Sequence, residues 1–283
     1  MAADFSEKIE LAYKKMSKGH KRIADFIVSN YDKAAFMTAN KLGKNVGVSE
    51  STVVRFAICL GYEGYPQLQH ELQEMIRSRL TGSQRMALNE DIPDNKIFEK
   101  VLKTDINNIR TTLNELDREQ FEKTVEVLLS AKRVYIMGVR SAEAIATLLS
   151  NYLDFMLGNV RCLQSSSSDT IEQLIHISPD DVFIGISFPR YSMRTVEAMR
   201  FAKSRGATCV AITDSAFSPL AEIVDIKMEV HCNTASFADS LVAPLSVINA
   251  FLAAISQKKK AELSKSLNEM EKIWNQSNFY ETN

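Results

Sequence analysis

The spacing of hydrophobic residues divides the chain into two parts with different periodicity. Up to about residue 80, apolar positions recur every three to four residues and no segment alternates apolar with polar positions, a pattern typical of α-helices. We therefore expect helices over 5–15, 18–30, 38–45, 49–60 and 65–80. Residues 81–95 lose the periodicity and read as a linker or loop, and two amphipathic helices are predicted after it, over 95–116 and 118–132.

From Arg133 onward, short β-branched runs alternate with helical segments. Strands are expected over 133–138, 159–163, 181–187, 207–213 and 224–230, and helices over 141–157, 169–177, 193–204, 218–223, 239–256 and 259–275. This alternation predicts an α/β fold with a doubly wound parallel sheet and helices on both of its faces. We assign residues 1–80 to an all-α domain, 81–105 to a linker and 106–283 to the α/β domain.

The segment 47–61, GVSESTVVRFAICLG, indicates the function of the helical domain. The preceding segment 38–46 predicts one helix, Gly47 permits a tight turn, and Ser49 is suited to cap the next helix. Gly43 is small where two such helices would press together. The apolar residues of the second helix recur at helical spacing and are expected to face inward: Val53, Phe56, Ala57 and Leu60. This arrangement is a helix-turn-helix with residues 49–59 as the recognition helix.

The polar side of this helix carries residue types that suit DNA. Arginine suits guanine or phosphate, serine suits phosphate or base edges, and a glutamate can accept from a cytosine amino group. Between residues 17 and 60, seven basic residues stand against three acidic ones, a net charge of +4 in a chain whose net charge is −1. The residues predicted to contact DNA are Ser49, Glu50, Ser51, Thr52, Arg55, Lys18 and Lys21. The alternative is a helical bundle whose arginine only solvates a surface.

Hydroxyl groups and arginines follow the predicted strands of the α/β part. Because ligands bind beyond the carboxyl ends of parallel strands, the segments GVRSAEA (138–144), SFPRYSMRT (187–195) and TDSAFSPL (213–220) are candidates for one site. A helix start after the first strand offers free N–H groups and a positive dipole end, which suit phosphate. The predicted contacts to an anionic, hydroxylated ligand such as a sugar phosphate come from Arg140, Ser141, Ser187, Arg190 and Ser192. Helix capping by the serines, and surface or interface ion pairs for the arginines, are the alternatives.

Composition narrows these interpretations. The four cysteines form no CxxC pair and lie in apolar surroundings, so we expect buried thiols in a reducing compartment, with a zinc site as the alternative. The longest apolar stretch, 241–255, contains Pro244, Ser246 and Asn249 and is too short for a bilayer, and no signal pattern precedes the first helix. We expect a cytoplasmic protein with no membrane segment and no cofactor or metal.

The same residues resemble a known family. SKGHKRIADFI and LGKNVGVSESTVVRFAICLGYEGYPQLQHEL (within 17–72) look like the N-terminal domain of the RpiR family of bacterial transcription regulators. VYIMGVRSAEAIATLL and DVFIGISFPRYSMRTVEAMRFAKSRGATCVAITDSAFSPLAEIVDI look like the SIS (sugar isomerase) domain of that family. The resemblance implies a regulator that binds a double-stranded DNA operator, senses a phosphorylated sugar, and works as a homodimer or homotetramer.

Two loops depart from the SIS pattern. The first commonly reads Gly-x-Gly-x-Ser, and here Arg140 and Ala142 take the places of the second glycine and the serine. The second commonly reads Ser-x-Ser-Gly-x-Thr, and here Pro189, Arg190 and Ser192 take the places of the second serine, the glycine and the threonine. The departures leave the individual phosphate contacts open.

Two other functions are alternatives to a regulator. A sugar-phosphate isomerase with a helical appendage needs a base beside the sugar carbon. The loops 138–143 and 187–195 supply only Glu143 as a carboxylate and no histidine, so we expect no enzyme activity. The third hypothesis is an oligomeric scaffold that uses the α/β fold without a ligand.

Overall fold

The computed structural model describes residues 8–9, 11–77, 81–87, 92–163, 170–216, 218–234 and 236–276. The chain divides into two compact units, 1–90 and 91–283. Within the range assigned to a linker from the sequence, the structure has helix α7 (Gly82–Ala87) and the beginning of α8 (Ile97–Glu115). The predicted domain boundaries at 80 and 105 stay predictions.

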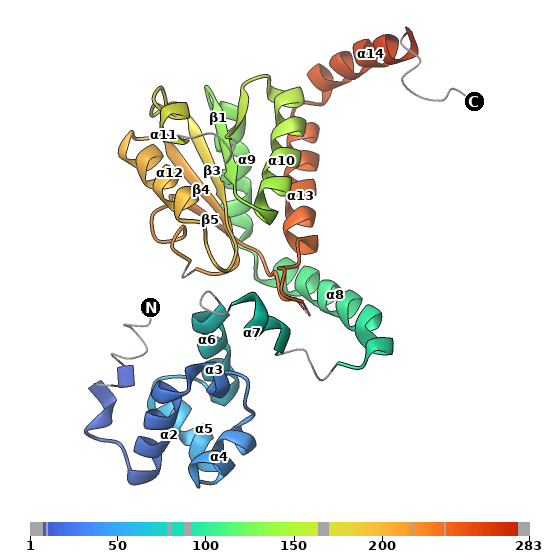
Figure 1. Ribbon diagram of the computed structural model, residues 1–283. Coiled ribbons are helices and arrows are strands. Elements are labelled where there is room, and N and C mark those ends of the chain that lie inside the picture. Colours follow the sequence, from blue (N-terminus) through green and yellow to red (C-terminus); the bar gives the residue numbers. More distant parts are fainter. Residues whose placement is uncertain are drawn as a thin grey trace. The chain divides into compact units, whose positions relative to one another are not determined.

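The first unit is helical in its described residues, as the periodicity predicts (Figure 1). Besides α7 it contains α2 (Lys18–Ser29), α3 (Tyr31–Ala34), α4 (Ala39–Val46), α5 (Glu50–Cys59) and α6 (Tyr65–Arg77). Its core is formed by fully buried side chains from successive helices, among them Ile23, Leu42, Phe56 and Leu68.

Polar side chains of α6 hold the chain around the end of α3. The Tyr65 hydroxyl and the Gln69 amide both donate to the carbonyl oxygen of Met37, at 2.7 and 3.0 Å. The Gln73 amide donates to the carbonyl oxygen of Ala35 at 3.0 Å. These bonds satisfy carbonyl groups in the segment that follows α3.

The second unit is built on a five-stranded parallel sheet of order β2-β1-β3-β4-β5. The strands are β1 (Val134–Gly138), β2 (Val160–Leu163), β3 (Val182–Ile186), β4 (Thr208–Thr213) and β5 (Ile226–Glu229). Its helices are the 3₁₀ turn η1 (Asp94–Lys96), α8, α9 (Arg118–Ser130), α10 (Ser141–Leu157), α11 (Thr170–Gln173), α12 (Met193–Ser204), α13 (Val242–Lys258) and α14 (Lys260–Gln276).

Two hydrophobic layers enclose the sheet, so the predicted doubly wound architecture is confirmed (Figure 1). Helices α9, α10 and α13 cover one face, and α11 and α12 cover the other. Every residue of β1 and β3 is buried, as continuous apolar strands in a parallel sheet should be. No helix in the described residues is long and apolar enough to cross a membrane.

Two expectations are wrong. Residues 218–223 form turns and no helix. The bonds there run from Ala221 N–H to the Ser218 hydroxyl and from Ile223 N–H to the Leu220 carbonyl, each spanning three residues, and no i-to-i+4 ladder develops. Of the four cysteines predicted to be buried, only Cys209 and Cys232 are; Cys59 is exposed on the outer side of α5 and Cys162 is intermediate.

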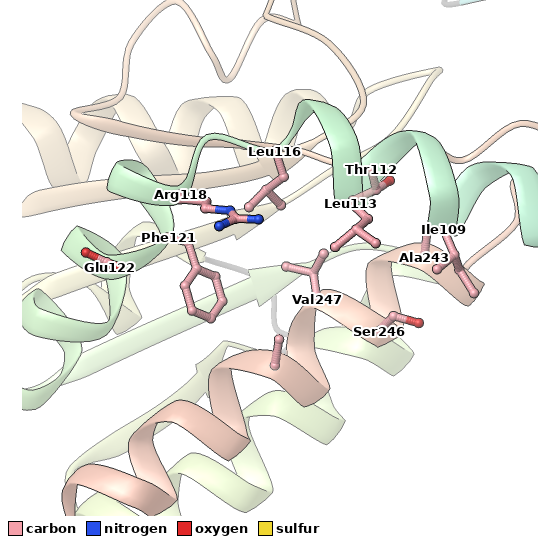
Figure 2. A pocket seen from close by; sticks show the side chains of 11 residues that line it. Ile109, Thr112, Leu113, Leu116, Arg118, Phe121, Glu122, Ala243, Ser246 and Val247 are labelled. Carbon is pink, nitrogen blue, oxygen red and sulfur yellow. The ribbon is translucent and has the colours of Figure 1, made fainter.

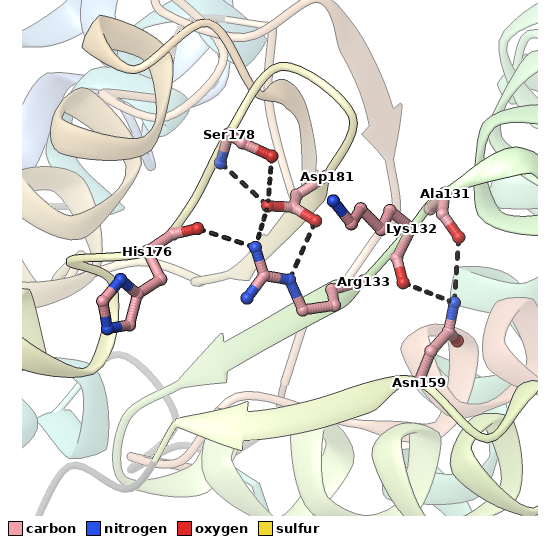
Figure 3. Close-up of polar contacts among 7 residues, drawn as sticks. All are labelled: Ala131, Lys132, Arg133, Asn159, His176, Ser178 and Asp181. Atoms are coloured by element: carbon pink, nitrogen blue, oxygen red, sulfur yellow. Dashed lines mark hydrogen bonds and ion pairs between the residues drawn. The ribbon is translucent and has the colours of Figure 1, made fainter.

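A buried ion pair closes the amino-terminal edge of the sheet (Figure 3). Asp181, whose side chain is 0% exposed, accepts from Arg133 Nε at 3.2 Å and Nη2 at 3.1 Å. It also accepts from the N–H and the hydroxyl of Ser178, both at 2.8 Å. Burial acts to raise the pKa of Asp181, but the bonds from Arg133 and Ser178 outweigh it and the pKa is lowered. This clamp joins the starts of β1 and β3, at the opposite end of the strands from the loops predicted to bind a ligand.

Candidate nucleic-acid interface and effector site

The predicted recognition helix exists as α5, with the cap and the orientation that the sequence indicates. The Ser49 hydroxyl accepts from Thr52 N–H at 3.3 Å, which caps the helix. Val53, Phe56 and Ala57 are buried. The other side presents exposed Ser49, Glu50, Ser51 and Arg55, while Thr52 is half-buried.

The exposed side chains of α5 are held in place by short-range bonds. The Ser49 hydroxyl lies 2.9 Å from the Ser51 hydroxyl and 2.8 Å from the Thr52 hydroxyl. Arg55 Nε donates to the Ser51 carbonyl oxygen at 3.3 Å, which lays the arginine along the helix. Glu50 accepts from the Asn40 amide at 3.3 Å, so α4 restrains this carboxylate. The polar side is therefore ordered before any DNA arrives.

Two glycines make the turn between α4 and α5 possible. Gly47 has φ 70° and ψ 43°, the left-handed conformation that glycine adopts without steric cost. A Cβ at Gly43 would lie 2.8 Å from the carbonyl oxygen of Val48, closer than packed atoms allow. The expectation that Gly43 stands where the two helices press together is confirmed.

The start of α2 lies beside the start of α5. A Cβ at Gly19 would touch Val48 at 3.5 Å and Thr52 at 3.4 Å, so the exposed Lys18 next to it is carried close to the turn. Lys21 is half-buried, and its ammonium group lies 5.1 Å from the centroid of the Tyr13 ring, a cation–π contact. The structure thus brings Lys18 to the recognition helix more directly than Lys21.

One basic residue of α2 beside the turn, Arg22, was not among the predicted DNA contacts. Arg22 is exposed, and its Nη1 lies 3.4 Å from where a Cβ at Gly47 would stand, beside the turn. Its spacing of four residues from Lys18, which places both on one helix face, is the sequence signal that could have identified it. His20 packs its ring against Phe56 at 5.7 Å. Burial, and then the charge of Arg55, lower the pKa of His20, so this side chain is neutral at neutral pH.

In the second unit, the register brings the predicted loops to one edge of the sheet. Gly138 pairs with Ile186, and Ile186 pairs with Ile212, so β1, β3 and β4 end at the same level. A Cβ at Gly138 would lie 2.4 Å from the Ala142 carbonyl oxygen, and α10 can start this close to β1 only because the residue is glycine.

Both serines of the second loop already accept a hydrogen bond from a backbone N–H group. The Ser187 hydroxyl, in a residue that is 4% exposed, accepts from Ser192 N–H at 3.2 Å. The Ser192 hydroxyl accepts from Thr195 N–H at 3.4 Å and caps α12. The capping alternative therefore holds for Ser192, whereas Ser187 accepts a bond within the loop; the second lone pair or the proton of each hydroxyl remains for a ligand.

The start of α10 differs from that of α12. Its N-cap residue is Arg140, which makes no side-chain cap bond among the described residues, and Ser141 next to it is exposed. The Glu143 N–H donates to the Arg140 carbonyl oxygen at 3.1 Å, and no side-chain oxygen within the described residues caps the positive end of this 17-residue helix.

Both arginines of the two loops have unusual backbone conformations. In the described residues, Arg140 at φ 60° and Arg190 at φ 67° are the non-glycine positions with positive φ. With ψ −123°, Arg140 has the angles of the first central residue of a type II′ turn, which glycine dominates. Both side chains are exposed. These are the two positions at which the SIS pattern commonly has glycine, so the loops keep a glycine-like backbone under an arginine side chain.

A hydrogen bond ties the second loop to the end of β4. The Tyr191 hydroxyl donates to Asp214 Oδ1 at 2.9 Å. In the first turn of α12, Thr195 is 0% exposed and its hydroxyl has no hydrogen-bond partner within the described part of the chain. The strand ends therefore combine buried polar groups with two exposed arginines, a composition suited to an anionic ligand.

Comparison with known proteins agrees with both halves of this description. Residues 3–79 match the model of the helix-turn-helix domain of the rpiR family, and residues 127–254 match the SIS domain. The chain is 30% identical over 221 residues to an uncharacterised HTH-type transcriptional regulator of Haemophilus influenzae, covering 77% of this chain and 76% of that protein.

Two solved structures resemble the fold. The sugar isomerase domain of an RpiR transcription factor from Sphaerobacter thermophilus matches with a TM-score of 0.58 and 30% identity, over 62% of this chain and 99% of that one. The Vibrio vulnificus NanR protein, solved with ManNAc-6P, matches with a TM-score of 0.56 and 20% identity, over 92% of this chain and 94% of that one. With the capped recognition helix and the five-stranded sheet, these matches show that the chain belongs to the RpiR family of HTH-type transcriptional regulators, which joins a helix-turn-helix domain to a SIS domain.

Proposed function

We propose that the first unit reads double-stranded DNA with α5 in the major groove, and that an anionic sugar phosphate bound at the strand ends of the second unit controls this binding. The observation that supports DNA reading is the ordered polar side of α5. Ser51 and Arg55 reach base edges, Glu50 is oriented by Asn40, and Lys18 and Arg22 take flanking phosphates.

The effector is proposed from the second unit. The uncapped start of α10 binds the phosphate together with the Ser141 hydroxyl, and Arg140 and Arg190 supply positive charge. Ser187 and Ser192, which shape the second loop, contact the ligand with the hydrogen-bonding capacity that capping leaves. NanR, which shares this fold, was solved with a sugar phosphate, and this favours the same ligand class here.

The regulator works as a homodimer or homotetramer, because two recognition helices must meet half-sites about 34–36 Å apart on the duplex. An effector changes this geometry only if it binds the two arrangements with different affinity. The loops 138–143 and 187–195 give an isomerase little support, since they offer Glu143 as their one carboxylate and carry no histidine.

DNA reading is tested by titrating fluorescent promoter DNA from the neighbouring genes. We expect Arg55→Ala to weaken DNA binding about 10-fold or more. If the guanidinium contacts a base with two hydrogen bonds, Arg55→Lys should weaken binding by most of this factor as well. Lys18→Ala should weaken binding to all sequences and reduce the slope of log affinity against log salt by about 1. Arg200→Ala, an exposed arginine on α12, is the control. Equal affinity for Arg55→Ala and the control refutes the proposed groove contact.

The effector site is tested by melting the protein with a panel of sugar phosphates that includes ManNAc-6P. A ligand at about 100 times its Kd stabilises the folded state by about 2.7 kcal/mol, or roughly 5–10 °C for a unit of this size. Ser141→Asp places a carboxylate where the phosphate is proposed to lie and should abolish the shift. No shift with any of these compounds, or an unchanged shift in Ser141→Asp, contradicts the assignment.

A further inference from the structure

The sheet changes its winding direction between β1 and β3, and we call this place the switch point. In the order β2-β1-β3-β4-β5, the chain moves outward from β1 to β2 and, in the opposite direction, from β3 to β4. Helix α10, which follows β1, covers one face of the sheet, and α12, which follows β3, covers the other (Figure 1). Ligands of open parallel sheets bind at such a point, outside the carboxyl ends of the two strands.

One arginine stands on each side of the switch point. Arg140 precedes α10 and Arg190 precedes the cap of α12, two and four residues after the paired strand ends Gly138 and Ile186. Because adjacent strands lie about 5 Å apart, one sugar-sized molecule can reach both loops. Both arginine side chains are exposed, and neither forms a hydrogen bond or an ion pair within the described residues. Both guanidinium groups are therefore available to a ligand.

The two sides of the switch point offer different groups to an anion. The start of α10 has no side-chain cap among the described residues, so its positive end and the Ser141 hydroxyl suit one phosphate. At the start of α12, the Ser192 hydroxyl accepts from Thr195 N–H at 3.4 Å, and Ser192 N–H donates to the Ser187 hydroxyl at 3.2 Å. Since the second loop uses these donors itself, the Arg190 guanidinium is the group that it offers to an anion.

The backbone indicates that both arginines are present for their side chains. Arg140 has φ 60° and Arg190 has φ 67°, values that glycine adopts without steric cost. A residue with a Cβ is strained in this conformation, and strain of this kind concentrates at ligand-binding sites. An arginine at each of these positions therefore points to a function that requires the guanidinium.

The exposed charge of the three strand-end loops is positive. Arg194, in the first turn of α12, is exposed like Arg140 and Arg190. The two carboxylates of these loops are less accessible: Glu143 is half-buried, and Asp214 is buried and accepts from the Tyr191 hydroxyl. Because a phosphate monoester carries about two negative charges, three exposed guanidinium groups exceed what one phosphate neutralises.

The hollow between α8, α9 and α13 does not suit a ligand with several charges (Figure 2). Its volume of about 390 Å³ would admit a small molecule, but most of its lining is apolar and includes Leu113, Phe121 and Val247. Its charged residues, Arg118 and Glu122, lie four residues apart on α9 and have opposite signs. Removing two anionic groups from water in such surroundings is unfavourable, which leaves the switch point as the site.

We propose that Arg190 binds a second anionic group of the effector, across the switch point from the phosphate at α10. The effector is then a phosphorylated sugar acid or a sugar bisphosphate, and a sugar phosphate with no further charge binds more weakly. A guanidinium binds a carboxylate or a phosphate through two parallel hydrogen bonds, so it is suited to either group. This inference rests on the proposed function, because it refines the ligand class of the same site.

Calorimetric titration of the full-length protein with matched compounds tests the ligand class. Glucose 6-phosphate and 6-phosphogluconate differ by a carboxylate. Fructose 6-phosphate and fructose 1,6-bisphosphate differ by a phosphate, as do ribose 5-phosphate and ribose 1,5-bisphosphate. In at least one pair, the compound with two anionic groups should bind about 10-fold or more tightly than its partner. The pair that shows this difference identifies the second group as a carboxylate or a phosphate.

Glycine variants test the residue in that pair, and glycine fits the observed backbone at both positions. Arg190→Gly should reduce the ratio of the two affinities about 10-fold or more, because only one compound of the pair contacts its side chain through the second anion. Arg140→Gly should weaken both compounds and leave their ratio within about 3-fold of the parent. Arg200→Ala, on the exposed side of α12, is the control and should change neither affinity.

The outcomes separate this inference from the proposed function. If the singly phosphorylated compound binds as tightly as its partner in every pair, or if Arg140→Gly and Arg190→Gly change the ratio equally, the proposal is wrong. A singly phosphorylated sugar that binds, and that Ser141→Asp no longer binds, would then leave the proposed effector site standing and remove only the second anion. Binding of none of the six compounds or of ManNAc-6P would overturn both.

Discussion

Replacing Arg140 by glycine should make the protein more stable and less responsive to its effector. At φ 60° and ψ −123°, a side-chain-bearing residue is strained by roughly 1–3 kcal/mol, because this region is accessible mainly to glycine. Glycine removes that strain. It also makes the unfolded chain more flexible, which costs about 0.4–1 kcal/mol.

The difference predicts a net gain of about 1 kcal/mol in the free energy of unfolding of the second unit. For a unit of this size that gain is roughly 2–4 °C in melting temperature. Arg190→Gly, at φ 67°, should shift stability in the same direction. Both substitutions remove a positive charge from the strand ends, so the affinity for an anionic effector should fall while the protein becomes harder to unfold.

Arg200 provides the control, because it is an exposed arginine in the interior of α12 with helical backbone angles. There, the same substitution should destabilise by about 1 kcal/mol. Calorimetry separates the melting of the two units, and urea unfolding followed by circular dichroism gives the free energies. If Arg140→Gly and Arg200→Gly lower the melting temperature by similar amounts, the backbone at Arg140 stores no strain that glycine can relieve, and the prediction is wrong.

Three further predictions concern stability and pH. Gly43→Ala should destabilise the first unit by about 2 kcal/mol and reduce DNA binding, because its Cβ would lie 2.8 Å from a backbone oxygen. Melting and fluorescence anisotropy measure the two effects. Gly64→Ala is the control and should be tolerated in both assays, because its Cβ would have its nearest contact at 3.6 Å. Asp181→Ala should cost about 2–3 kcal/mol by leaving Arg133 and its neighbouring donors without their acceptor, and urea titration measures the loss. Because the pKa of Asp181 is lowered in the folded state, its contribution to the free energy of unfolding is present above the unfolded value near 3.8 and is lost as pH falls through the folded pKa. If the melting temperature of Asp181→Ala depends on acid pH in the same way as that of the parent, this prediction is wrong. The pKa of His20 is also lowered, so the unfolded state binds more protons and stability should decline as pH falls below about 6.5, a decline that His20→Gln should reduce.

The sequence identified the features that depend on local chemistry. The recognition helix, its serine cap and its left-handed glycine appear where the pattern predicted them, because capping and turn formation are decided within a few residues. The buried strands and their order along the chain followed from β-branched runs for the same reason.

The sequence did not predict features that depend on tertiary contacts. Periodicity predicted a helix over 95–116, yet it could not show that Asn108 would be buried, because the bonds that compensate its burial come from Asn233, 125 positions away. Nor does the identity of Arg140 reveal its backbone angles, which the close approach of α10 to Gly138 imposes. Cys59 was predicted to be buried because its neighbours are apolar, but it falls on the side of α5 that faces away from the core.

The strand order has a consequence for how the protein is made. In the sheet, β1 lies between β2 and β3, and the last strand to join, β5, ends at Glu229. The helical unit, whose contacts lie within residues 1–90, can fold as soon as it leaves the ribosome. At roughly 5–20 residues per second, the ~140 residues still needed to complete the sheet take about 7–28 s to synthesise. During that interval a nascent chain can carry a folded recognition helix while its sheet is still incomplete, so a ligand site built on the strand ends cannot yet form.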